Sequence, residues 1–392
     1  MPPTPFGEHP KYTPVLPQIA LSFLRLGTIA FGGPAAHIAM MEEEFVRRRG
    51  WVSHADFLDM LGASNLIPGP SSTEMAIHIG HQRAGWRGLI IAGVSFILPA
   101  MLMVMVCAWA YTTFGALPPI QRVLYGVKPV IIAIVLQALW RLAGIAVKDM
   151  LLAVLTLLAT VAALTGLNIL VILPVTGFVA MLQAWNRERI AYANPAALST
   201  IKSLLAPAAA AVATVPVGLG GLFLLFLKFG SVIFGSGYVL LAFLQADLVN
   251  RLHWLTQAQR LDAVAIGQVT PGPVFTTATF IGYLLGGVPG ALVATLGIFL
   301  PGFLLVAASR PLISRIRGSK IAGAFLDGVN VGAVGLMIAV TWQLSRAAVI
   351  DSLTGGIAAL STLLLIYFRI SSVWLILAGG FIGLIAKQWL GG

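Results

Sequence analysis

Two breaks in otherwise apolar sequence carry the residues best suited to bind a ligand. The first runs through Asn65, Pro68, Gly69, Pro70, Ser71, Ser72, Thr73 and Glu74, and the second through Gln268, Pro271, Gly272, Pro273, Thr276 and Thr277. Each break frees backbone N–H and C=O groups, which survive at membrane depth only where protein or a water-filled cavity satisfies them. A helix that begins after such a break attracts anions through its free N–H groups and its dipole. Two matched breaks of this kind are typical of a transport site.

The composition places these breaks in a membrane protein. Of 392 residues, 58% are hydrophobic and 9% are charged, whereas soluble domains carry about 25% charged residues. The net charge of +11 comes from basic residues in short turns between apolar runs, which the positive-inside rule explains. We therefore expect an integral protein of the bilayer and no nucleic-acid partner.

The two breaks belong to a tandem duplication with an offset of about 200 residues. Phe23–Thr28 aligns with Phe226–Ser231, Pro68–Pro70 with Pro271–Pro273, and Leu98–Pro99 with Leu300–Pro301. We expect an N-terminal tail at residues 1–16, a first transmembrane repeat at 17–185, a linker at 186–217 and a second repeat at 218–392.

The apolar runs predict an all-α fold with about ten crossings plus two broken, re-entrant helical hairpins. The runs are 17–41, 55–81, 88–114, 123–147, 150–167 and 168–185, repeated at 218–244, 258–284, 289–309, 325–346, 350–368 and 372–390. Several approach the ~20 residues that a crossing helix needs. Runs 55–81 and 258–284 contain the breaks and are expected to dip into the membrane and return.

Charge placement predicts that the second repeat is inverted relative to the first. Basic residues cluster after the first run of the first half, at Arg47–Arg49, and after the third run of the second half, at 310–320. If basic loops face the cytoplasm, equivalent loops lie on opposite sides. The same assignment counts Arg141 among the basic residues inside and Arg260, in the loop after the first run of the second half, among those outside.

Arg25 and Lys228 are basic residues within spans at equivalent repeat positions. A charge at the bilayer centre costs about 2.5–3.5 kcal/mol on insertion scales, which favours a binding role for both on one anion. Snorkelling to the interface and pairing with an acid are the alternatives.

A glycine-rich break also interrupts the first run, at Gly32, Gly33 and Pro34. It would start another half-helix aimed at an anion, or allow close helix packing. His37 follows one turn later and is a candidate for binding the anion or a proton, or a satisfied core histidine.

The remaining polar groups of the first break admit more than one role. Ser71 and Glu74 fit the capping-box spacing, and Glu74 is also a candidate proton carrier. The hydroxyls of Thr73, Thr276 and Thr277 and the amides of Asn65 and Gln268 suit a tetrahedral oxyanion. No nucleotide, dinucleotide or zinc-protease motif is present, and Cys107 is the single cysteine, so we expect no cofactor, no metal and no enzyme activity.

The ordered motifs resemble the chromate ion transporter (CHR) family in its long, two-domain form. The resemblance covers essentially the full chain and is carried by Phe31–Pro34 with His37, Glu44–Trp51, Pro68–Thr73 and Ala92–Pro99. It implies a multi-pass transporter of the bacterial inner membrane that exports chromate, confers chromate resistance and accepts sulfate as a competitor. The resemblance implies that the residues most important for function are Arg25 and the two proline–glycine segments of the first half, Phe31–Pro34 and Pro68–Pro70.

We therefore predict a secondary transporter of an oxyanion dianion that works by alternating access. A sulfate or other oxyanion carrier of the same architecture is the nearest alternative. A membrane-bound chromate reductase and an anion channel are more distant ones, and a homodimer is left open.

Overall fold

The computed structural model describes residues 15–31, 33–64, 67–115, 117–191, 218–233, 237–316, 320–368 and 370–389, and its regular structure there is entirely helical. The first half contains α1 (Val15–Ile29), α2 (Gly33–Met41), η1 (Glu42–Arg48), α3 (His54–Ser64), α4 (Ser71–Phe114), α5 (Pro118–Ala146), α6 (Met150–Leu164) and α7 (Ile169–Ala191). The second contains α8 (Leu219–Val232), η2 (Gly237–Val239), α9 (Leu240–Phe243), η3 (Leu244–Arg251), α10 (Gln257–Val269), η4 (Val274–Thr276), α11 (Thr277–Ile316), α12 (Lys320–Ala348), α13 (Ser352–Ile366) and α14 (Ser372–Trp389).

Ten apolar helices in the described part of the chain agree with the predicted all-α membrane fold. Five are long and apolar enough to cross a membrane, within α4, α5, α7, α11 and α12. Five more apolar helices have 10–17 residues, within α1, α6, α8, α13 and α14. A 15-residue helix is only about 22 Å long, so these shorter helices span less than the hydrocarbon core.

The breaks fall where the sequence predicts them, and each run that contains a break ends at a sharp turn before the next run. α3 ends before the first break and α4 begins directly after it, at Ser71. α4 then runs through a sharp kink at Gly85 (φ 59°, ψ −145°), and α11 has the same kink at Gly287 (φ 60°, ψ −151°). Since glycine tolerates positive φ, each kink separates two helices that fold back on one another, with Gly80 against Gly88 in α4 and Gly282 against Gly290 in α11. The two separate runs expected on either side of each kink are therefore confirmed.

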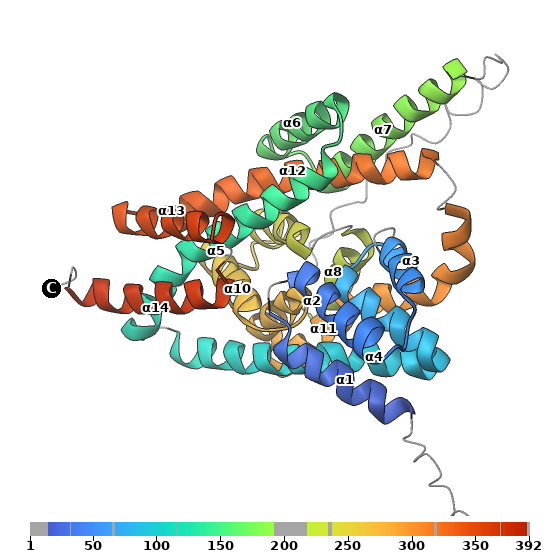
Figure 1. Ribbon diagram of the computed structural model, residues 1–392. Coiled ribbons are helices and arrows are strands. Elements are labelled where there is room, and N and C mark those ends of the chain that lie inside the picture. Colours follow the sequence, from blue (N-terminus) through green and yellow to red (C-terminus); the bar gives the residue numbers. More distant parts are fainter. Residues whose placement is uncertain are drawn as a thin grey trace, which may run out of the picture.

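The two repeats are interleaved. α6 and α7 of the first repeat pack on α12 of the second, while α13 and α14 pack on α5 of the first (Figure 1). Glycine permits both contacts, because a Cβ at Gly126 of α5 would collide with Gly379 of α14, and one at Gly328 of α12 with Thr176 of α7. Each repeat therefore depends on helices of the other repeat for part of its packing.

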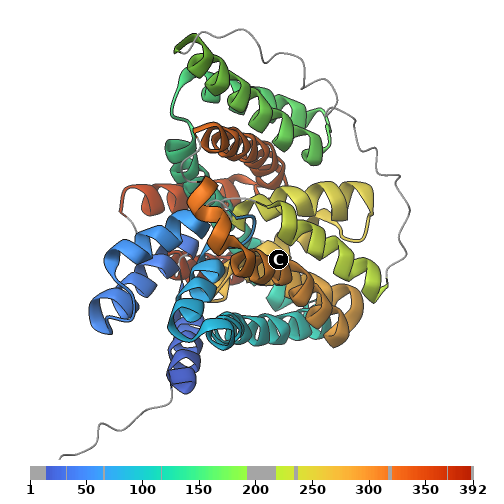
Figure 2. The same ribbon diagram turned by 90° about the vertical axis from the view of Figure 1, so that its right-hand side faces the viewer.

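Equivalent helices run in opposite directions, as an inverted repeat requires. In Figure 1, α7 ends at the upper right, whereas its equivalent α14 ends at the C-terminus on the left. Viewed from the right-hand side in Figure 2, the blue helices that open the first repeat and the yellow-green helices that open the second lie on opposite sides of the molecule.

The two breaks are held by hydrogen bonds exchanged between the repeats. The Gly69 N–H donates to the Ile233 carbonyl at the end of α8 (2.7 Å), and the Gly272 N–H donates to the Ala30 carbonyl after α1 (2.9 Å). Donors and acceptors occupy equivalent positions in the two repeats, so the contacts are related by the internal symmetry. Each repeat thus supplies the acceptor that the other repeat's irregular backbone needs.

We expect Gly272→Ala to lower the free energy of unfolding by about 2 kcal/mol or more. Gly272 has φ 92°, which L-residues rarely adopt, and its Cβ would lie 2.6 Å from the Cβ of Ala100. The measurement is the midpoint of thermal unfolding in detergent. Gly356→Ala in α13 is the control, because a Cβ there meets nothing within 4 Å, and it should leave the midpoint unchanged or slightly higher. Equal midpoints for the two variants would contradict the expected strain of an alanine at position 272.

Candidate functional site

A polar cavity of about 500 Å³ lies where the two breaks meet α5 and α14. Residues of both repeats line it. Its described lining is Ala30, Gly33, Pro34, Ala35, Ile38, Leu61, Ser71, Ile134, Gln137, Ala138, Arg141, Leu142, Ile145, Tyr238, Gly267, Gln268, Thr270, Gly272, Val274, Leu365, Ile370, Ser371 and Ser372. The equivalent positions Ala35 and Tyr238, and likewise Ser71 and Val274, both contribute, so the cavity includes the centre of the internal symmetry.

The cavity has hydrogen-bond donors and a positive charge. Arg141 of α5 lines it and is exposed, so its guanidinium is available to a ligand. The Tyr238 hydroxyl donates to Oε1 of Gln268 (3.4 Å), while Nε2 of Gln268 has no hydrogen-bond partner. None of the described residues that line the cavity is acidic. An unpaired amide donor beside an uncompensated cation favours an anion.

Three helices also begin at the cavity wall. α2 starts at Gly33, α4 at Ser71 and α14 at Ser372, and each of these residues lines the cavity. The first N–H groups of a helix have no partner within it, and the helix dipole adds a partial positive charge at this end. Together with Arg141, these three helix ends supply the charge and the donors that a small, multiply charged anion would need.

Five predicted site residues line the cavity: Gly33, Pro34, Ser71, Gln268 and Gly272. Other predicted residues of the two breaks are described but do not line the cavity; they are Pro68, Gly69, Pro70, Ser72, Pro271 and Pro273. The predictions for Gly32 and Asn65 lie outside the described residues.

The predicted threonine donors of the second break bond to their own helix start. Thr276 Oγ1 donates to the Pro273 carbonyl and Thr277 Oγ1 to the Val274 carbonyl, both at 2.8 Å. Both side chains are buried and neither lines the cavity. In this conformation these hydroxyls stabilise the turn that starts α11 instead of facing a ligand.

The capping-box interpretation of Ser71 and Glu74 is wrong. Pro70 is the N-cap of α4 and no side chain caps that helix. Glu74 is fully buried beside Gly69 and Gly302, and both of its carboxyl oxygens lack a hydrogen-bond partner, as does the Thr73 hydroxyl. Glu74 therefore contributes nothing to the cap.

His37 reinforces the exchanged backbone contact. Its Nε2 lies 3.0 Å from the Ala30 carbonyl, which also accepts from Gly272, while its Nδ1 has no partner. The ring packs edge-on against Phe96 at 5.7 Å between centroids. This contact positions the end of α1, and His37 does not line the cavity.

Arg25 and Lys228 each lie near an acidic residue of their own repeat instead of facing the cavity. Lys228 Nζ lies 2.6 Å from Asp247 of the π-helix η3, and Arg251 Nε lies 2.9 Å from the same carboxylate. Arg25 is exposed on α1, and its charge acts on Glu44 of η1, the equivalent of Asp247. Acid pairing, one of the alternatives above, therefore describes Lys228.

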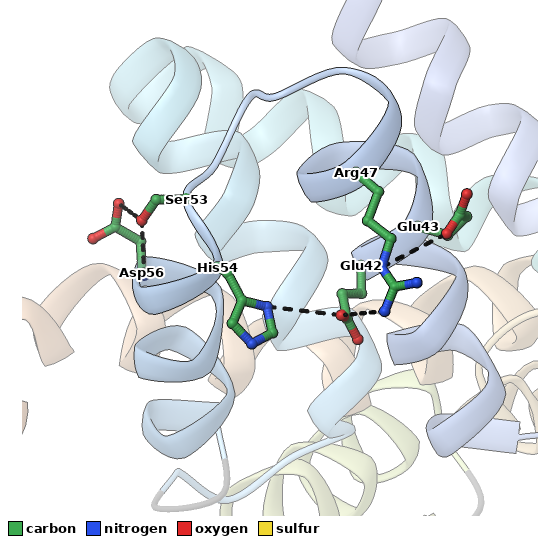
Figure 3. Close-up of polar contacts among 6 residues, drawn as sticks. All are labelled: Glu42, Glu43, Arg47, Ser53, His54 and Asp56. Atoms are coloured by element: carbon green, nitrogen blue, oxygen red, sulfur yellow. Dashed lines mark hydrogen bonds and ion pairs between the residues drawn. The ribbon is translucent and has the colours of Figure 1, made fainter.

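The acidic and basic residues around η1 form a surface network that joins it to α3. A hydrogen bond from Arg49 (2.6 Å) holds the pKa of Glu44 below its usual range, with smaller effects from the charges of Arg48 and Arg25. Figure 3 shows the neighbouring contacts, in which Glu42 meets Arg47 at 3.3 Å and His54 at 3.7 Å.

Arg260 is not a loop residue. It lies in α10, is fully buried, and donates from Nη2 to Gln257 (2.9 Å), while its Nε and Nη1 have no partner. Apolar Phe57 occupies the equivalent position in the first repeat. Arg260 therefore lies within helix α10 and not in the loop to which the sequence assigned it.

Sequence reasoning missed six polar residues of the cavity: Gln137, Arg141, Tyr238, Thr270, Ser371 and Ser372. Arg141 lies inside the predicted run 123–147, and its polarity within that run was the available signal. No group of three or more His, Cys, Asp or Glu side chains that could hold a metal ion occurs among the described residues.

The sequence matches known proteins over nearly its whole length. The family described as "Chromate transporter" matches twice, at residues 17–183 and 220–384. A chromate transport protein of Cupriavidus metallidurans is 33% identical over 97% of this chain and 95% of its own length. One of Pseudomonas aeruginosa is 32% identical over 94% and 91%, and a probable chromate transport protein of Synechococcus elongatus is 32% identical over 90% and 91%. No solved structure matches.

We expect Lys228→Met to lower the free energy of unfolding by about 1–2 kcal/mol, because it removes one of two cations from a mostly buried carboxylate. Arg25→Met should cost less than about 0.5 kcal/mol, since Arg25 is exposed. Thermal unfolding in detergent gives both values. The double variant Lys228→Met with Asp247→Asn should recover part of the loss, and a loss that is simply additive would show that the two side chains do not interact.

Proposed function

Since this chain belongs to the chromate transporter family, we propose that it exports chromate from the cytoplasm as a secondary transporter. The observation that carries the proposal is the cavity at the breaks, where Arg141, the free Nε2 of Gln268 and three helix N-termini converge without an acidic residue. Such a site recognises a tetrahedral dianion by charge and by donors that surround its oxygens. The names of the relatives support chromate as that dianion.

Electrostatics favours export over import. With a negative interior, each elementary charge gains about 2.3 kcal/mol per 100 mV on leaving, so a dianion gains about 4.6 kcal/mol. The membrane potential alone then suffices to drive chromate out, which would protect the cell. Import of sulfate would need a coupled ion to overcome the same difference.

Alternating access would arise from the inverted repeats. The exchanged bonds from Gly69 to Ile233 and from Gly272 to Ala30 tie each break to the end of the other repeat's first helix. Rocking of one repeat against the other would move these breaks together and shift access from one face to the other. We place the basic loops in the cytoplasm and the protein in the bacterial inner membrane, with residues 17–185 and 218–392 as the two repeat units.

Glu74 is the proposed proton-coupling residue, with His37 as a second candidate. An unpaired charge buried as deeply as the Glu74 carboxyl is costly, and Gly302 of the other repeat lies against it. Ionisation would therefore require the repeats to separate and admit water or a cation. Thr277 holds the equivalent position in the second repeat, so coupling of this kind would belong to one repeat only.

Arg25 and Lys228 are suited to attract the dianion toward the protein by their charge. Each lies near an acid on a π-helix, Glu44 or Asp247, and the basic residues at each place outnumber that acid. A local positive excess raises the concentration of a dianion nearby. We therefore propose that they attract the substrate, whereas Arg141 holds it.

The deciding experiment measures chromate uptake into inverted membrane vesicles with an imposed interior-positive potential, where export appears as uptake. We expect saturable uptake that rises with the potential. Arg141→Gln should raise KM about tenfold or more, because a charged hydrogen bond contributes about 1.5–3 kcal/mol, and Arg141→Lys should raise it less. Arg346→Gln is the control, since Arg346 is exposed on α12 outside the cavity, and it should leave KM within twofold.

An unchanged KM in Arg141→Gln would overturn the site. Saturable uptake of sulfate with none of chromate would instead favour the sulfate carrier of the same architecture. Flux that does not saturate and far exceeds carrier rates would favour a channel.

Glu74→Gln tests the coupling. We expect it to abolish the dependence of chromate uptake on a pH gradient while leaving uptake driven by the potential, because glutamine keeps the shape but cannot release a proton. Vesicles with either gradient imposed alone separate the two effects. Wild-type uptake that ignores the pH gradient would rule out proton coupling through Glu74.

A further inference from the structure

A second polar cavity, of about 380 Å³, is the symmetry equivalent of the first. On α12 it is lined by Leu336, Ala339, Val340 and Gln343, which correspond one to one with the first-cavity residues Ile134, Gln137, Ala138 and Arg141 of α5. Ala163, Asn168 and Ile169 line it in the same way that Leu365, Ile370 and Ser371 line the first. The internal symmetry therefore relates the two cavities, and not only the helices around them.

The two cavities differ in depth. The first reaches both breaks, through Ser71 and Gly272, whereas no described residue of either break lines the second. The second ends instead on the π-helix η3, at Gln245, Asp247, Asn250 and Arg251. One cavity thus communicates with the centre of the molecule, while its equivalent stops short of it.

The polar groups of the second cavity suit an anion less well than those of the first, because the acid Asp247 lines it and the Gln245 amide already donates to Asn250 (2.7 Å). Asp247 is held between Lys228 (2.6 Å) and Arg251 (2.9 Å), so two cations face one carboxylate. Gln245 is 4% exposed and its Oε1 has no partner, and Oε1 of Gln343 has none either. With its oxygen unpaired, the Gln343 amide is free to turn its NH₂ group toward an incoming oxyanion.

We propose that the second cavity is the opposite vestibule of the same transport path, a weaker oxyanion site where Gln343 takes the place that Arg141 has in the first. This rests on the proposed function. In an inverted repeat, symmetry-equivalent cavities open to opposite faces of the membrane. The present conformation connects the Arg141 vestibule to the breaks, and exchange of the two repeat conformations connects the Gln343 vestibule instead.

The exchange of arginine for glutamine makes the two faces unequal. An amide offers a neutral donor, whereas a guanidinium offers a charged, forked one. The oxyanion should bind more tightly at the Arg141 vestibule and leave more readily at the Gln343 vestibule. The positions of the basic loops put the Arg141 vestibule on the cytoplasmic side of the membrane. This difference sets the half-saturating concentration at each face, while the gradient and the potential still fix the direction of net flux.

Thiol labelling tests the placement of the two vestibules without requiring transport. In a Cys107→Ser background, Arg141→Cys and Gln343→Cys form a matched pair, each treated with a charged, membrane-impermeant maleimide in inverted and in right-side-out vesicles. We expect Arg141→Cys to react in inverted vesicles and Gln343→Cys in right-side-out ones. Labelling of both positions from the same face would overturn the proposal.

Transport by Gln343→Arg tests the weaker affinity. We expect KM for chromate measured from the Gln343 face to fall about tenfold, with KM from the Arg141 face within threefold of wild type. An unchanged KM at the Gln343 face, in a variant that still transports, would overturn the second site. Wild-type protein that moves no chromate would refute the proposed function instead, while opposite-face labelling would still support two vestibules.

Discussion

Irregular backbone inside a membrane must find hydrogen-bond partners within the protein, and this structure meets that constraint by exchange between repeats. The Gly69 N–H bonds to Ile233 and the Gly272 N–H bonds to Ala30. The Ala30 carbonyl is further engaged by His37. Each break bonds to the end of a helix from the other repeat. A shift of one repeat against the other would therefore move or break these hydrogen bonds.

This dependence explains why the cavity lies at the centre and why it is electropositive. The breaks that open helix N-termini toward the cavity are the same segments that hold the repeats together. α5 and α12 add the side chains that face the two cavities, and their outer contacts with α14 and α7 are made through Gly126 and Gly328. A movement between the repeats therefore changes the cavity, the breaks and the long helices at once, which is the coupling that a transporter needs.

The scaffold is symmetric, but the side chains that matter for an anion are not. Arg141 corresponds to Gln343, Glu74 to Thr277, and Phe57 to the buried Arg260. Both repeats share the same irregular backbone features: the breaks, the kinks at Gly85 and Gly287, and the two π-helices. We read this as one framework with two unequal binding faces.

The sequence by itself determined the membrane class, the duplication and the position of both breaks, because composition, repetition and proline are local properties of a chain. It also singled out Gln268 and Ser71, which line the cavity. Only the tertiary structure decided that Arg141 lines the cavity while Lys228 pairs with Asp247. The physical reason is that the position of a charged residue within an apolar run indicates its depth in the membrane, but not which neighbouring helix or cavity its side chain faces. Which face of a helix meets a cavity depends on neighbours supplied here by the other repeat, some 200 residues away in the chain.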